Sequence, residues 1–386
     1  MPVKNDLQKI RARLAAGEPL PQALAEIPAL YTEELANMRS RVRTELAGAG
    51  ITIVPLLEEL ETTDVLVNGV GQVWVDRGRG LEKVPVADRQ LQSEAGVRAL
   101  AVRLAASCGQ RLDDASPIVD GTFASGIRLH AVLPPIAAEG TLISLRKHRQ
   151  QRLELGDLLA NNSIHPQLEK LLRQLVAQRA NVIISGATGA GKTTFLNAML
   201  SLVPAEERIL IIEEAAELRP VHPHVVHLQV RHANVQGAGA ISMSSLVRAA
   251  MRMRPDRLVL GECRGAEVRD VLGALNTGHE GGWATIHANS ALDVPARLVA
   301  LGALADMQEA TVAAQAAAAL DAVIHIRREG AQRYISQIAV LERRRGELYT
   351  EIAVEVQGRD IEFTPAFCRL AERFSLEKNP ENRRRK

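Results

Sequence analysis

From residue 181 onward, short apolar runs alternate with stretches in which apolar residues recur every three or four positions. Runs of four or five apolar residues between polar or glycine residues indicate buried strands, and the three-to-four spacing indicates amphipathic helices. Strands that alternate with helices are typical of a parallel sheet covered by helices. The predicted strands are 181–185, 208–212, 257–261 and 283–287, and the predicted helices are 192–203, 242–253 and 266–275.

The first part of the chain follows a different pattern. Residues 6–47 carry Leu, Ile and Ala at helical spacing, and three prolines divide this stretch into pieces. The alternating segments 63–69 and 72–76 surround the dipeptide Asn68-Gly69, which is a strong hairpin signal. A helix is expected at 93–106, with further strands at 127–133 and 141–145. These elements predict a smaller α+β domain.

The patterns divide the chain into five segments. Two more strands, 334–341 and 348–356, are expected to form an antiparallel pair appended to the sheet, and 379–386 is expected to be a disordered tail. The predicted segments are an N-terminal helical segment at 1–50, the α+β domain at 51–147, a polar linker at 148–160, the α/β domain at 161–357, and a C-terminal extension with a basic tail at 358–386.

Composition excludes several classes of protein. Hydrophobic residues make up 46% of the 386 positions and charged residues 24%, as in soluble globular proteins. The low aromatic content of 3% and the net charge of +2 argue against a base-stacking nucleic-acid surface. The three cysteines show no pairing pattern, so a reducing compartment is expected. The chain shows no secretory signal and no apolar run of roughly 18 residues, and we therefore expect a cytoplasmic protein.

The strongest chemical signal is the stretch GATGAGKT, which directly follows the predicted strand 181–185. It fits the pattern GxxxxGK[ST] of a phosphate-binding P-loop, with the strand before it and the helix after it that this motif requires. Such a loop points backbone N–H groups and the positive end of a helix dipole at a triphosphate. Lys192 is expected to reach the β- and γ-phosphates, and the Thr193 hydroxyl to bind Mg²⁺. The predicted binding residues for ATP are Gly186, Ala187, Thr188, Gly189, Ala190, Gly191, Lys192, Thr193 and Thr194.

Two further apolar strands end in carboxylates. Glu262 follows 258–261 and has the form of a Walker B element with Glu in place of Asp, which would hold Mg²⁺ through a water. Glu213 and Glu214 end the strand 209–212; if that strand neighbours the P-loop strand, a carboxylate there can orient and deprotonate the attacking water. On the residue pattern alone, a strand-capping acid at Glu262 and a solvated acidic turn at Glu213 remain open alternatives.

Four boxes in this order, GATGAGKT, IIEEAAEL, RMRPDRLVLGECRG and TGHEGGWATIHANS, resemble the type II/type IV secretion ATPase superfamily. The resemblance covers roughly residues 50 to 355. The chain is similar in particular to the branch of this superfamily that assembles Tad (Flp) pili. It implies a RecA-like ATPase domain, a smaller α+β domain that closes over the nucleotide, and a homohexameric ring. It also implies an inner-membrane platform protein as partner, a place on the inner face of the cytoplasmic membrane, and no specific nucleic acid.

The resemblance also implies roles for single residues. Glu213 matches the first acid of the acidic box and is implied to be the general base, while Glu214 stands where many relatives have Asp. Glu262 matches the Walker B glutamate. His287 matches the family's His box, which couples nucleotide state to movement; Trp283 and Ala284 depart from the usual residues of that box.

Arginines are expected to oppose the negative charge that develops during phosphoryl transfer. Arg128 and Arg146 match arginines with which the family's N-terminal domain reaches over the nucleotide, and Arg231 matches an arginine after the acidic box. His227 stands where many relatives carry another arginine, so that contact is expected to be lost or pH-sensitive. A surface salt bridge is the alternative for each arginine. Weaker candidates flank the Walker B strand: Arg252, Arg254 and Arg257.

Other polar clusters are read as structural. His222, His224 and His227 resemble a metal-binding group, but along a strand His222 and His224 share one face while His227 points to the other. The basic runs 343–345 and 383–386 could touch anionic lipid or nucleic acid, and a solvated turn and tail are favoured instead. The role of His279 stays open.

Two other functions remain as alternatives to a secretion or pilus motor. A hexameric motor that translocates nucleic acid shares the RecA-like ring, and the low aromatic content and balanced charge count against it. A non-hydrolysing assembly scaffold would use ATP only to order the ring, and the intact Lys192, Glu213 and Glu262 count against that. Whether the machine extends a pilus, retracts it or exports a substrate is not decided by the sequence.

Overall fold

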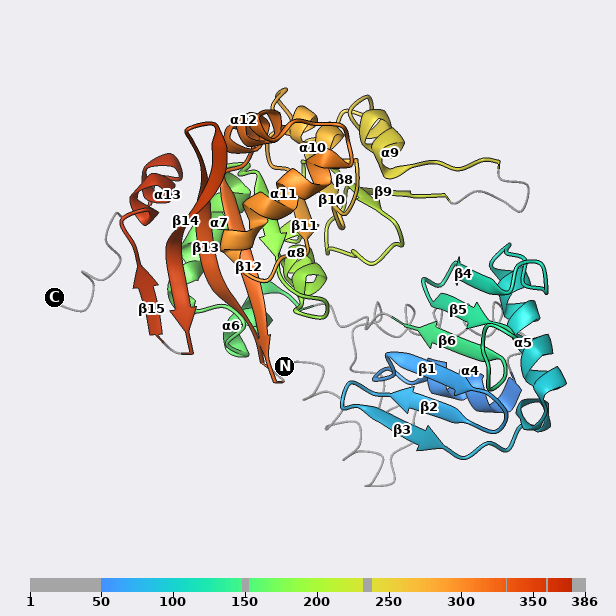
Figure 1. Ribbon diagram of the computed structural model, residues 1–386. Coiled ribbons are helices and arrows are strands. Elements are labelled where there is room, and N and C mark those ends of the chain that lie inside the picture. Colours follow the sequence, from blue (N-terminus) through green and yellow to red (C-terminus); the bar gives the residue numbers. More distant parts are fainter. Residues whose placement is uncertain (1–49, 148–152, 232–237, 331, 359, 377–386) are drawn as a thin grey trace, which may run out of the picture. The chain divides into compact units, whose positions relative to one another are not determined.

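The computed structural model describes residues 50–147, 153–231, 238–330, 332–358 and 360–376 (Figure 1). The chain divides into two compact units, Met1–Gln151 and Arg152–Lys386. The predicted helical stretch at 6–47 and the predicted tail at 379–386 lie outside the described residues.

In its described residues, the N-terminal unit is an antiparallel sheet with the α-helices α4 and α5. Its described strands pair in the order β3-β2-β1-β6-β5-β4, and every pairing is antiparallel. The predicted hairpin is present as β1 and β2, and the helix predicted at 93–106 is α5. The elements are α4 (Gly50–Glu58), β1 (Asp64–Asn68), β2 (Val73–Asp76), β3 (Leu81–Val84), a 3₁₀ helix (Arg89–Gln92), α5 (Glu94–Ser107), β4 (Ile118–Thr122), β5 (Arg128–Val132) and β6 (Leu142–Arg146).

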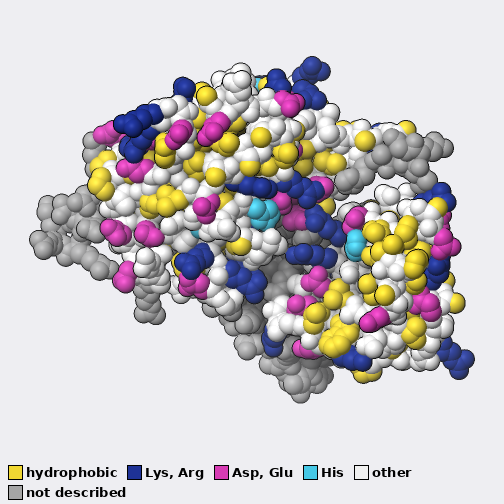
Figure 2. Space-filling model, viewed as in Figure 1, with side chains coloured by type: hydrophobic (Ala, Val, Ile, Leu, Met, Phe, Trp, Pro, Cys, Tyr) yellow, Lys and Arg dark blue, Asp and Glu magenta, His cyan; other side chains and the backbone are white. Residues whose placement is uncertain are grey.

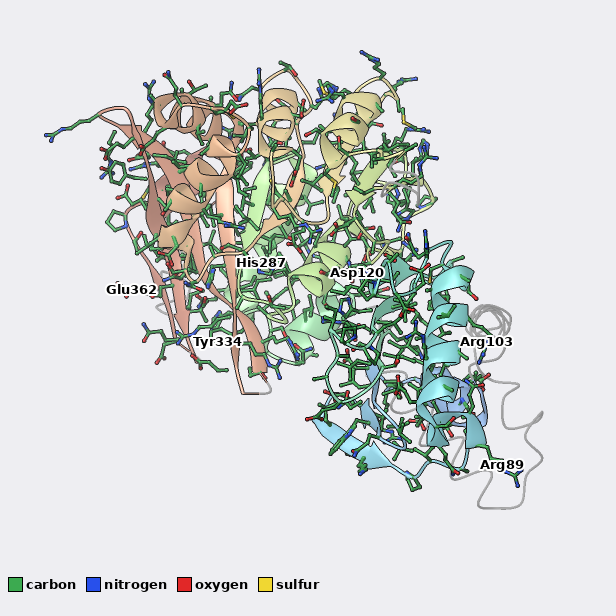
Figure 3. The ribbon with its side chains drawn as sticks, turned by 45° about the vertical axis from the view of Figure 1, so that its right-hand side comes forward. Arg89, Arg103, Asp120, His287, Tyr334 and Glu362 are labelled. Atoms are coloured by element: carbon green, nitrogen blue, oxygen red, sulfur yellow. The ribbon has the colours of Figure 1, made fainter. Side chains whose placement is uncertain are left out.

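Alternation along these strands builds a core on one face of the sheet. Leu129 and Ala131 of β5 and Ile143 and Leu145 of β6 are buried in the cluster that contains the apolar residues of α4 and α5. The residues between them face the other side, as expected for an antiparallel sheet with one covered face. Arg128 therefore lies on the face opposite this core. Figure 3 shows Arg103 of α5 and Arg89 of the 3₁₀ helix, both exposed on the helical side of this unit.

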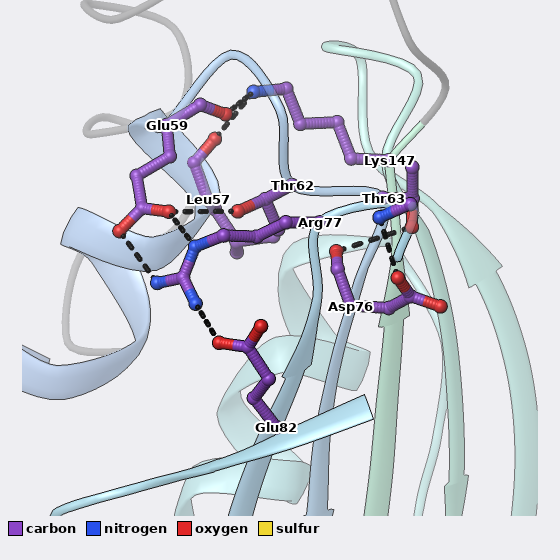
Figure 4. Close-up of polar contacts among 9 residues, drawn as sticks. Leu57, Glu59, Thr62, Thr63, Asp76, Arg77, Glu82 and Lys147 are labelled. Carbon is purple, nitrogen blue, oxygen red and sulfur yellow. Dashed lines mark hydrogen bonds and ion pairs between the residues drawn. The ribbon is translucent and has the colours of Figure 1, made fainter. Parts of the chain in front are cut away.

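A buried lysine after β6 ties this strand to the end of α4 (Figure 4). Lys147 is only 5% exposed, and its Nζ donates to the carbonyl oxygens of Leu57 and Glu59 at 2.7 and 2.8 Å. These carbonyls lie at the end of α4, where a helix leaves acceptors unsatisfied and a cation is favourable. The Lys147 backbone N–H also donates to Thr63 O at 2.7 Å. Lys147 therefore contacts both the end of α4 and the residue before β1.

The C-terminal unit is built on one sheet, whose described strands run β15-β14-β13-β12-β7-β11-β10-β8-β9. The six from β12 to β9 are parallel, and β13 to β15 add antiparallel pairs at one edge. The strands are β7 (Val182–Ser185), β8 (Ile209–Glu213), β9 (Val225–Gln229), β10 (Arg257–Leu260), β11 (Trp283–Ile286), β12 (Ala322–Glu329), β13 (Gln332–Arg344), β14 (Glu347–Gln357) and β15 (Asp360–Phe363).

Helices cover both faces of this sheet. One apolar cluster contains residues of α6, α7, α8 and α13, and a second contains residues of α9, α10, α11 and α12. The central strands are buried along their whole length, as in sheets with both faces covered. The helices are α6 (Leu155–Ala160), α7 (Glu169–Ala177), α8 (Lys192–Leu200), α9 (Met243–Ala250), α10 (Val268–Leu275), α11 (Val294–Ala303), α12 (Glu309–Ala319) and α13 (Phe367–Arg373), with 3₁₀ helices at Pro166–Leu168 and Ala291–Asp293.

The predicted α/β alternation is confirmed, and segments at both ends of this unit differ from the prediction. Residues 155–160, predicted as polar linker, form α6, because Leu155 and Leu158 are buried in the core. The apolar stretch near 310–326 is the helix α12 followed by the strand β12, which was not predicted. Residues 360–373, predicted as an extension, supply β15 to the sheet and α13 to the core through the buried Phe367 and Leu370.

Candidate functional site

The P-loop connects β7 to α8, as predicted. Gly186, Gly189 and Gly191 have φ of 154°, 72° and 101°, a backbone region that L residues with a Cβ rarely adopt. Gly186 also has no room for a side chain, since a Cβ there would lie 2.4 Å from the carbonyl oxygen of Ile326 on the neighbouring β12. The glycines are therefore required by the shape of the loop.

The start of α8 is open to an anion. The N-cap residue of α8 is Gly191, and no side chain at this position accepts a hydrogen bond from the N–H groups of the first turn. Residues 187–189 of the loop are exposed, Thr193 in the first turn is partly exposed and Thr194 is exposed. Backbone N–H groups and the helix dipole therefore meet at an accessible surface that suits a phosphate.

Lys192 is buried within the loop. Its Nζ donates to Gly186 O at 2.8 Å and to Ala187 O at 3.0 Å, and lies 3.4 Å from His287 Nδ1. Burial lowers the pKa of Lys192, and the nearby Glu262 carboxylate opposes that change. A phosphate would favour the charged ammonium further, because an adjacent opposite charge favours the ionised form.

Glu262 and His287 come together beside Lys192. Glu262 follows β10 and His287 follows β11, and these strands are parallel neighbours. Oε1 of Glu262 lies 3.3 Å from Nε2 of His287. Thr285 links the two strand ends, because its hydroxyl donates to Gly261 O at 2.6 Å and its carbonyl accepts from Cys263 N at 2.8 Å. The Glu262 and His287 side chains are each more than a third exposed, so they can reach a ligand.

Glu213 is the last residue of β8, and its place differs from one premise of the prediction. Strand β8 does not neighbour the P-loop strand, since β10 and β11 lie between them. The Glu213 side chain instead crosses the end of β10: a Cβ on Gly261 would lie 2.8 Å from Glu213 Cγ. Gly261 is thus a residue that lets Glu213 approach the loop containing Glu262.

The environment of Glu213 alters its acidity. Glu213 is 4% exposed, and its Oε1 accepts hydrogen bonds from the backbone N–H groups of Glu217 and Leu218 at 3.0 and 2.9 Å. Burial raises the pKa of Glu213 from 4.5 to about 7, although the two hydrogen bonds act in the opposite direction. A carboxyl group with a pKa near neutrality can both take up and release a proton at working pH.

The neighbours of Glu213 are a second acid and a histidine. Glu214 forms an ion pair with Arg264 and points to a different partner from Glu213. His227 on β9 lies with its Nδ1 3.9 Å from Glu213 Oε2, and burial lowers the pKa of His227. His227, which the resemblance places where many relatives carry an arginine, therefore faces Glu213 with a side chain whose neutral form is favoured.

The predicted arginines occupy separate places. Arg128 and Arg146 are directly opposite each other on β5 and β6 of the N-terminal unit. Arg231 follows β9, and its Nε donates to Gly239 O at 2.5 Å. Of the weaker candidates, Arg257 begins β10, at the edge of the sheet away from the P-loop, and is buried in a pair with Glu207 at 2.5 Å. Arg257 is therefore structural.

The structure brings three residues to the P-loop that were not predicted. Arg333 of β13 donates from Nε to Gly189 O at 3.0 Å. Arg328 of β12 approaches Gly189, where a Cβ would lie 3.7 Å from its guanidinium. His325, also of β12, is buried and lies 2.9 Å from the Ser185 hydroxyl through Nδ1, and burial lowers its pKa to about 4. All three lie on or beside β12, the strand missed in the sequence.

His222 and His224 have local partners. His222 Nε2 lies 2.9 Å from Pro204 O, and His224 Nε2 lies 3.0 Å from Arg208. His279 precedes β11 and so lies at the opposite edge of the sheet from His287. Across the described ranges there is no group of three or more His, Cys, Asp or Glu residues arranged to hold a metal ion.

The site as a whole is polar and charged. Figure 3 shows His287 beyond the C-terminal end of the central strands, and Tyr334 on the β13 side of the same unit. Figure 2 shows Lys, Arg, Asp, Glu and His side chains close together on the same face of the C-terminal unit. Among the helices of the described residues, none has both the length and the apolar character of a membrane-spanning segment.

Comparison with known proteins identifies relatives along most of the chain. The family described as "Type II/IV secretion system protein" matches residues 47–357. The chain is 49% identical over 324 residues to "Putative conjugal transfer protein MT3759" of Mycobacterium tuberculosis, covering 82% of this chain and 91% of the relative. It is 29% identical over 298 residues to "Conjugal transfer protein TrbB" of Rhizobium radiobacter, covering 76% and 88%.

The fold has a counterpart among solved structures. The crystal structure of the pilus retraction motor PilT with bound ADP aligns with a TM-score of 0.54 and 22% sequence identity, covering 79% of this chain and 83% of that one. At that identity the likeness concerns the fold. It agrees with the parallel sheet and P-loop described above, and the predicted RecA-like fold is confirmed.

Proposed function

The chain belongs to the type II/IV secretion system protein family, and on that premise we propose that it is an ATP-hydrolysing motor subunit of a secretion or pilus-assembly machine. The observation that carries the proposal is that the open P-loop, Lys192, His287 and Glu262 lie together at the C-terminal ends of the central strands. A phosphate-binding loop beside a carboxylate and a histidine at strand ends is suited to phosphoryl transfer.

Each residue of this edge has a proposed role. The loop N–H groups and Lys192 hold the phosphates, and Thr193 and Glu262 hold Mg²⁺, the latter through a water. Bound Mg²⁺ supplies positive charge that neutralises the phosphates. Glu213 acts as general base toward the attacking water; its raised pKa, about 7, supports this role because its carboxyl can accept a proton near neutral pH.

His287 is proposed to link nucleotide state to movement. It lies between a group that binds phosphate, Lys192, and a group that binds metal, Glu262. A ligand that draws either group toward itself changes the contacts of the imidazole. The loop after β11, which carries His287, can pass that change to the rest of the subunit.

The N-terminal unit is proposed as the domain that closes over the nucleotide, with 51–147 and 161–357 as the two domains. Arg128 and Arg146 lie side by side on the sheet face opposite the core, which suits recognition of a polyanion. Arg231 is proposed to contact a neighbouring subunit in a homohexameric ring. A closure of this kind excludes water from the reacting phosphate and completes the site.

The machine itself is proposed from the sequence boxes, which favour the Tad (Flp) pilus-assembly branch. In that setting the ring works in the cytoplasm against an inner-membrane platform protein and is not specific for nucleic acid. A second candidate, a conjugal-transfer machine, is favoured by the names of the relatives from Mycobacterium tuberculosis and Rhizobium radiobacter. Counting surface pili and measuring plasmid transfer in cells that carry Lys192→Ala separates the two, because only one process should fail.

The proposed ATPase activity is tested by measuring the rate of ATP hydrolysis across a series of protein concentrations, with and without DNA. Specific activity that rises with protein concentration and is unchanged by DNA is expected of a self-assembling secretion motor. Activity that requires DNA would instead indicate a nucleic-acid motor, and its salt dependence would show the phosphate contacts. ATP-dependent assembly without phosphate release would indicate a scaffold.

A further inference from the structure

The β12–β13 hairpin places two arginines against the P-loop. Arg328 and Arg333 are directly opposite each other in the antiparallel register of this hairpin. Arg333 donates to Gly189 O at 3.0 Å, and its side chain also packs on Gly191, where a Cβ would lie 3.1 Å from Arg333 Cδ. The Arg328 guanidinium lies 3.7 Å from the position of a Cβ on Gly189. Both side chains therefore point to the loop.

Strand alternation separates these arginines from their neighbours. Ile324 and Ile326, which share a face of β12 with Arg328, belong to the core that includes α8, the helix after the P-loop. Arg327 lies on the other face, opposite Tyr334, and lines a polar cavity together with the buried His325. Arg327 also forms an ion pair with Glu329 at 3.3 Å. Of the arginines at 327, 328 and 333, two face the phosphate-binding loop and one faces away from it.

The arrangement concentrates positive charge at the loop. Like charges directly opposite in an antiparallel pair repel, and Lys192 adds a third positive charge at the same loop. The Nε of Arg328 donates to Gly330 O at 2.9 Å, and the Nε of Arg333 donates to Gly189 O, so both of these bonds go to backbone carbonyls. An anion at the P-loop would be attracted by these three positive charges.

We propose that Arg328 and Arg333 form a phosphate clamp that acts from the same chain as the P-loop. Arg333 is a positioning residue: by holding the Gly189 carbonyl it keeps that oxygen away from the ligand and leaves the loop N–H groups turned inward. Arg328 contributes charge to the terminal phosphates of a nucleoside triphosphate. The inference rests on the proposed function in one respect, that the anion at the loop is ATP.

The test is direct binding of a fluorescent ATP analogue, and of the matching ADP analogue, to the full chain. Arg328→Ala and Arg333→Ala are each expected to weaken binding of the triphosphate by about tenfold, as for loss of one charge-assisted contact. For Arg328→Ala the loss should be smaller for the diphosphate. Arg328→Lys, which keeps the charge, should bind within about threefold of the wild type. Arg327→Ala is the matched control on the opposite face of the strand and should bind as the wild type does.

The outcomes separate this inference from the proposed function. Triphosphate affinity in Arg328→Ala and Arg333→Ala equal to that of Arg327→Ala would overturn the clamp, even if the wild type hydrolyses ATP. If both variants bind the triphosphate more weakly but the wild type releases no phosphate from ATP, the clamp is upheld and the proposed ATP hydrolysis is contradicted. Thermal unfolding without nucleotide shows whether each variant is folded; if Arg333→Ala is not, the two Arg328 variants decide. No binding of ATP by the wild type would contradict both proposals.

Discussion

The imidazole of His287 lies 3.3 Å from the carboxylate of Glu262, measured from Nε2 to Oε1. The two residues follow β11 and β10, so the parallel pairing of these strands fixes their separation. The other ring nitrogen of His287 lies 3.4 Å from Lys192 Nζ. One histidine therefore joins the strand-end carboxylate to the lysine of the P-loop.

Replacing either member of this pair should slow turnover, and the two losses should not add. We expect Glu262→Gln and His287→Ala each to lower kcat at least about tenfold, and the double variant to be little slower than the worse single variant, because residues in one network act as a unit. Steady-state rates of the three variants and the wild type give the coupling. Fully additive losses would mean that the two side chains act independently.

Glu213→Gln should abolish most of the turnover while leaving nucleotide binding intact. Loss of a general base lowers kcat by roughly 10²–10⁴-fold, and the amide oxygen can still accept from the N–H groups of Glu217 and Leu218. Glu214→Gln is the matched control, because Glu214 is paired with Arg264 instead. Substantial activity in Glu213→Gln would refute the assignment of Glu213 as base.

The rate of hydrolysis should rise with pH and level off above about pH 7. Burial raises the pKa of Glu213 to about 7, and a base acts only when ionised, so kcat should fall about tenfold for each pH unit below that value. The charged groups that act on this carboxyl are Glu217 and Arg219, with His227 close by. A kcat profile that is flat from about pH 5.5 to about pH 8 would contradict this prediction.

The same shift predicts the pH dependence of stability. The folded chain binds more protons at Glu213 than the unfolded chain does between pH 4.5 and about 7. The contribution of Glu213 to the free energy of unfolding is therefore fully present below pH 4.5 and is lost as pH rises through about 7. At about pH 8, Glu213→Gln should unfold at the same temperature as the wild type or higher, since it removes a buried charge. A clearly lower midpoint of thermal unfolding would contradict the inference that burial disfavours the ionised Glu213 carboxylate.

Gly261→Ala should disturb the site through Glu213. An added Cβ would lie 2.8 Å from Glu213 Cγ, so the Glu213 side chain must move. We expect a large loss of kcat together with a loss of about 1–3 kcal/mol of stability, the usual range for overpacking. Gly273→Ala is the matched control within α10, where a Cβ meets nothing within 4 Å. Equal activity of the two variants would show that the position of Glu213 does not matter.

Phe367→Ala should destabilise the C-terminal unit by about 3–5 kcal/mol, as for a buried aromatic residue. Phe367 is 4% exposed, and its ring meets that of Phe363 edge-on with centroids 4.8 Å apart. Leu304→Ala is the control, because Leu304 is 64% exposed and its loss should cost less than about 0.5 kcal/mol. Denaturant unfolding of both variants measures the difference. A change below about 1 kcal/mol for Phe367→Ala would mean that α13 is not part of the cooperative core.

The elements around the P-loop could be predicted because local sequence determines them. The strand β7 is a short, largely apolar run, and the loop after it needs glycine at three positive φ values, so both leave a clear pattern. Glu262 could likewise be found as a polar residue after an apolar strand, whereas His287 was singled out only by the resemblance to the family's His box. Their contact depends on strand order, which pattern alone did not give.

Contacts between distant segments could not be predicted. β12 follows an alanine-rich helix without a turn signal, so its strand and its arginines were missed. The sequence left open whether β8 lies beside β7, and in the sheet two strands separate them. α13 has an ordinary polar surface, and only its packing shows that Phe367 and Leu370 belong to the core.

Phosphate release from ATP and Mg²⁺ by the purified full chain, beside Lys192→Ala, tests the proposed motor most directly. Lys192 is held within the P-loop by Gly186 O and Ala187 O, so its loss removes the charge from the centre of the site. We predict steady release by the wild type and loss of nearly all of it in Lys192→Ala, with both proteins folded. Equal release by the two would place hydrolysis elsewhere and contradict the proposal.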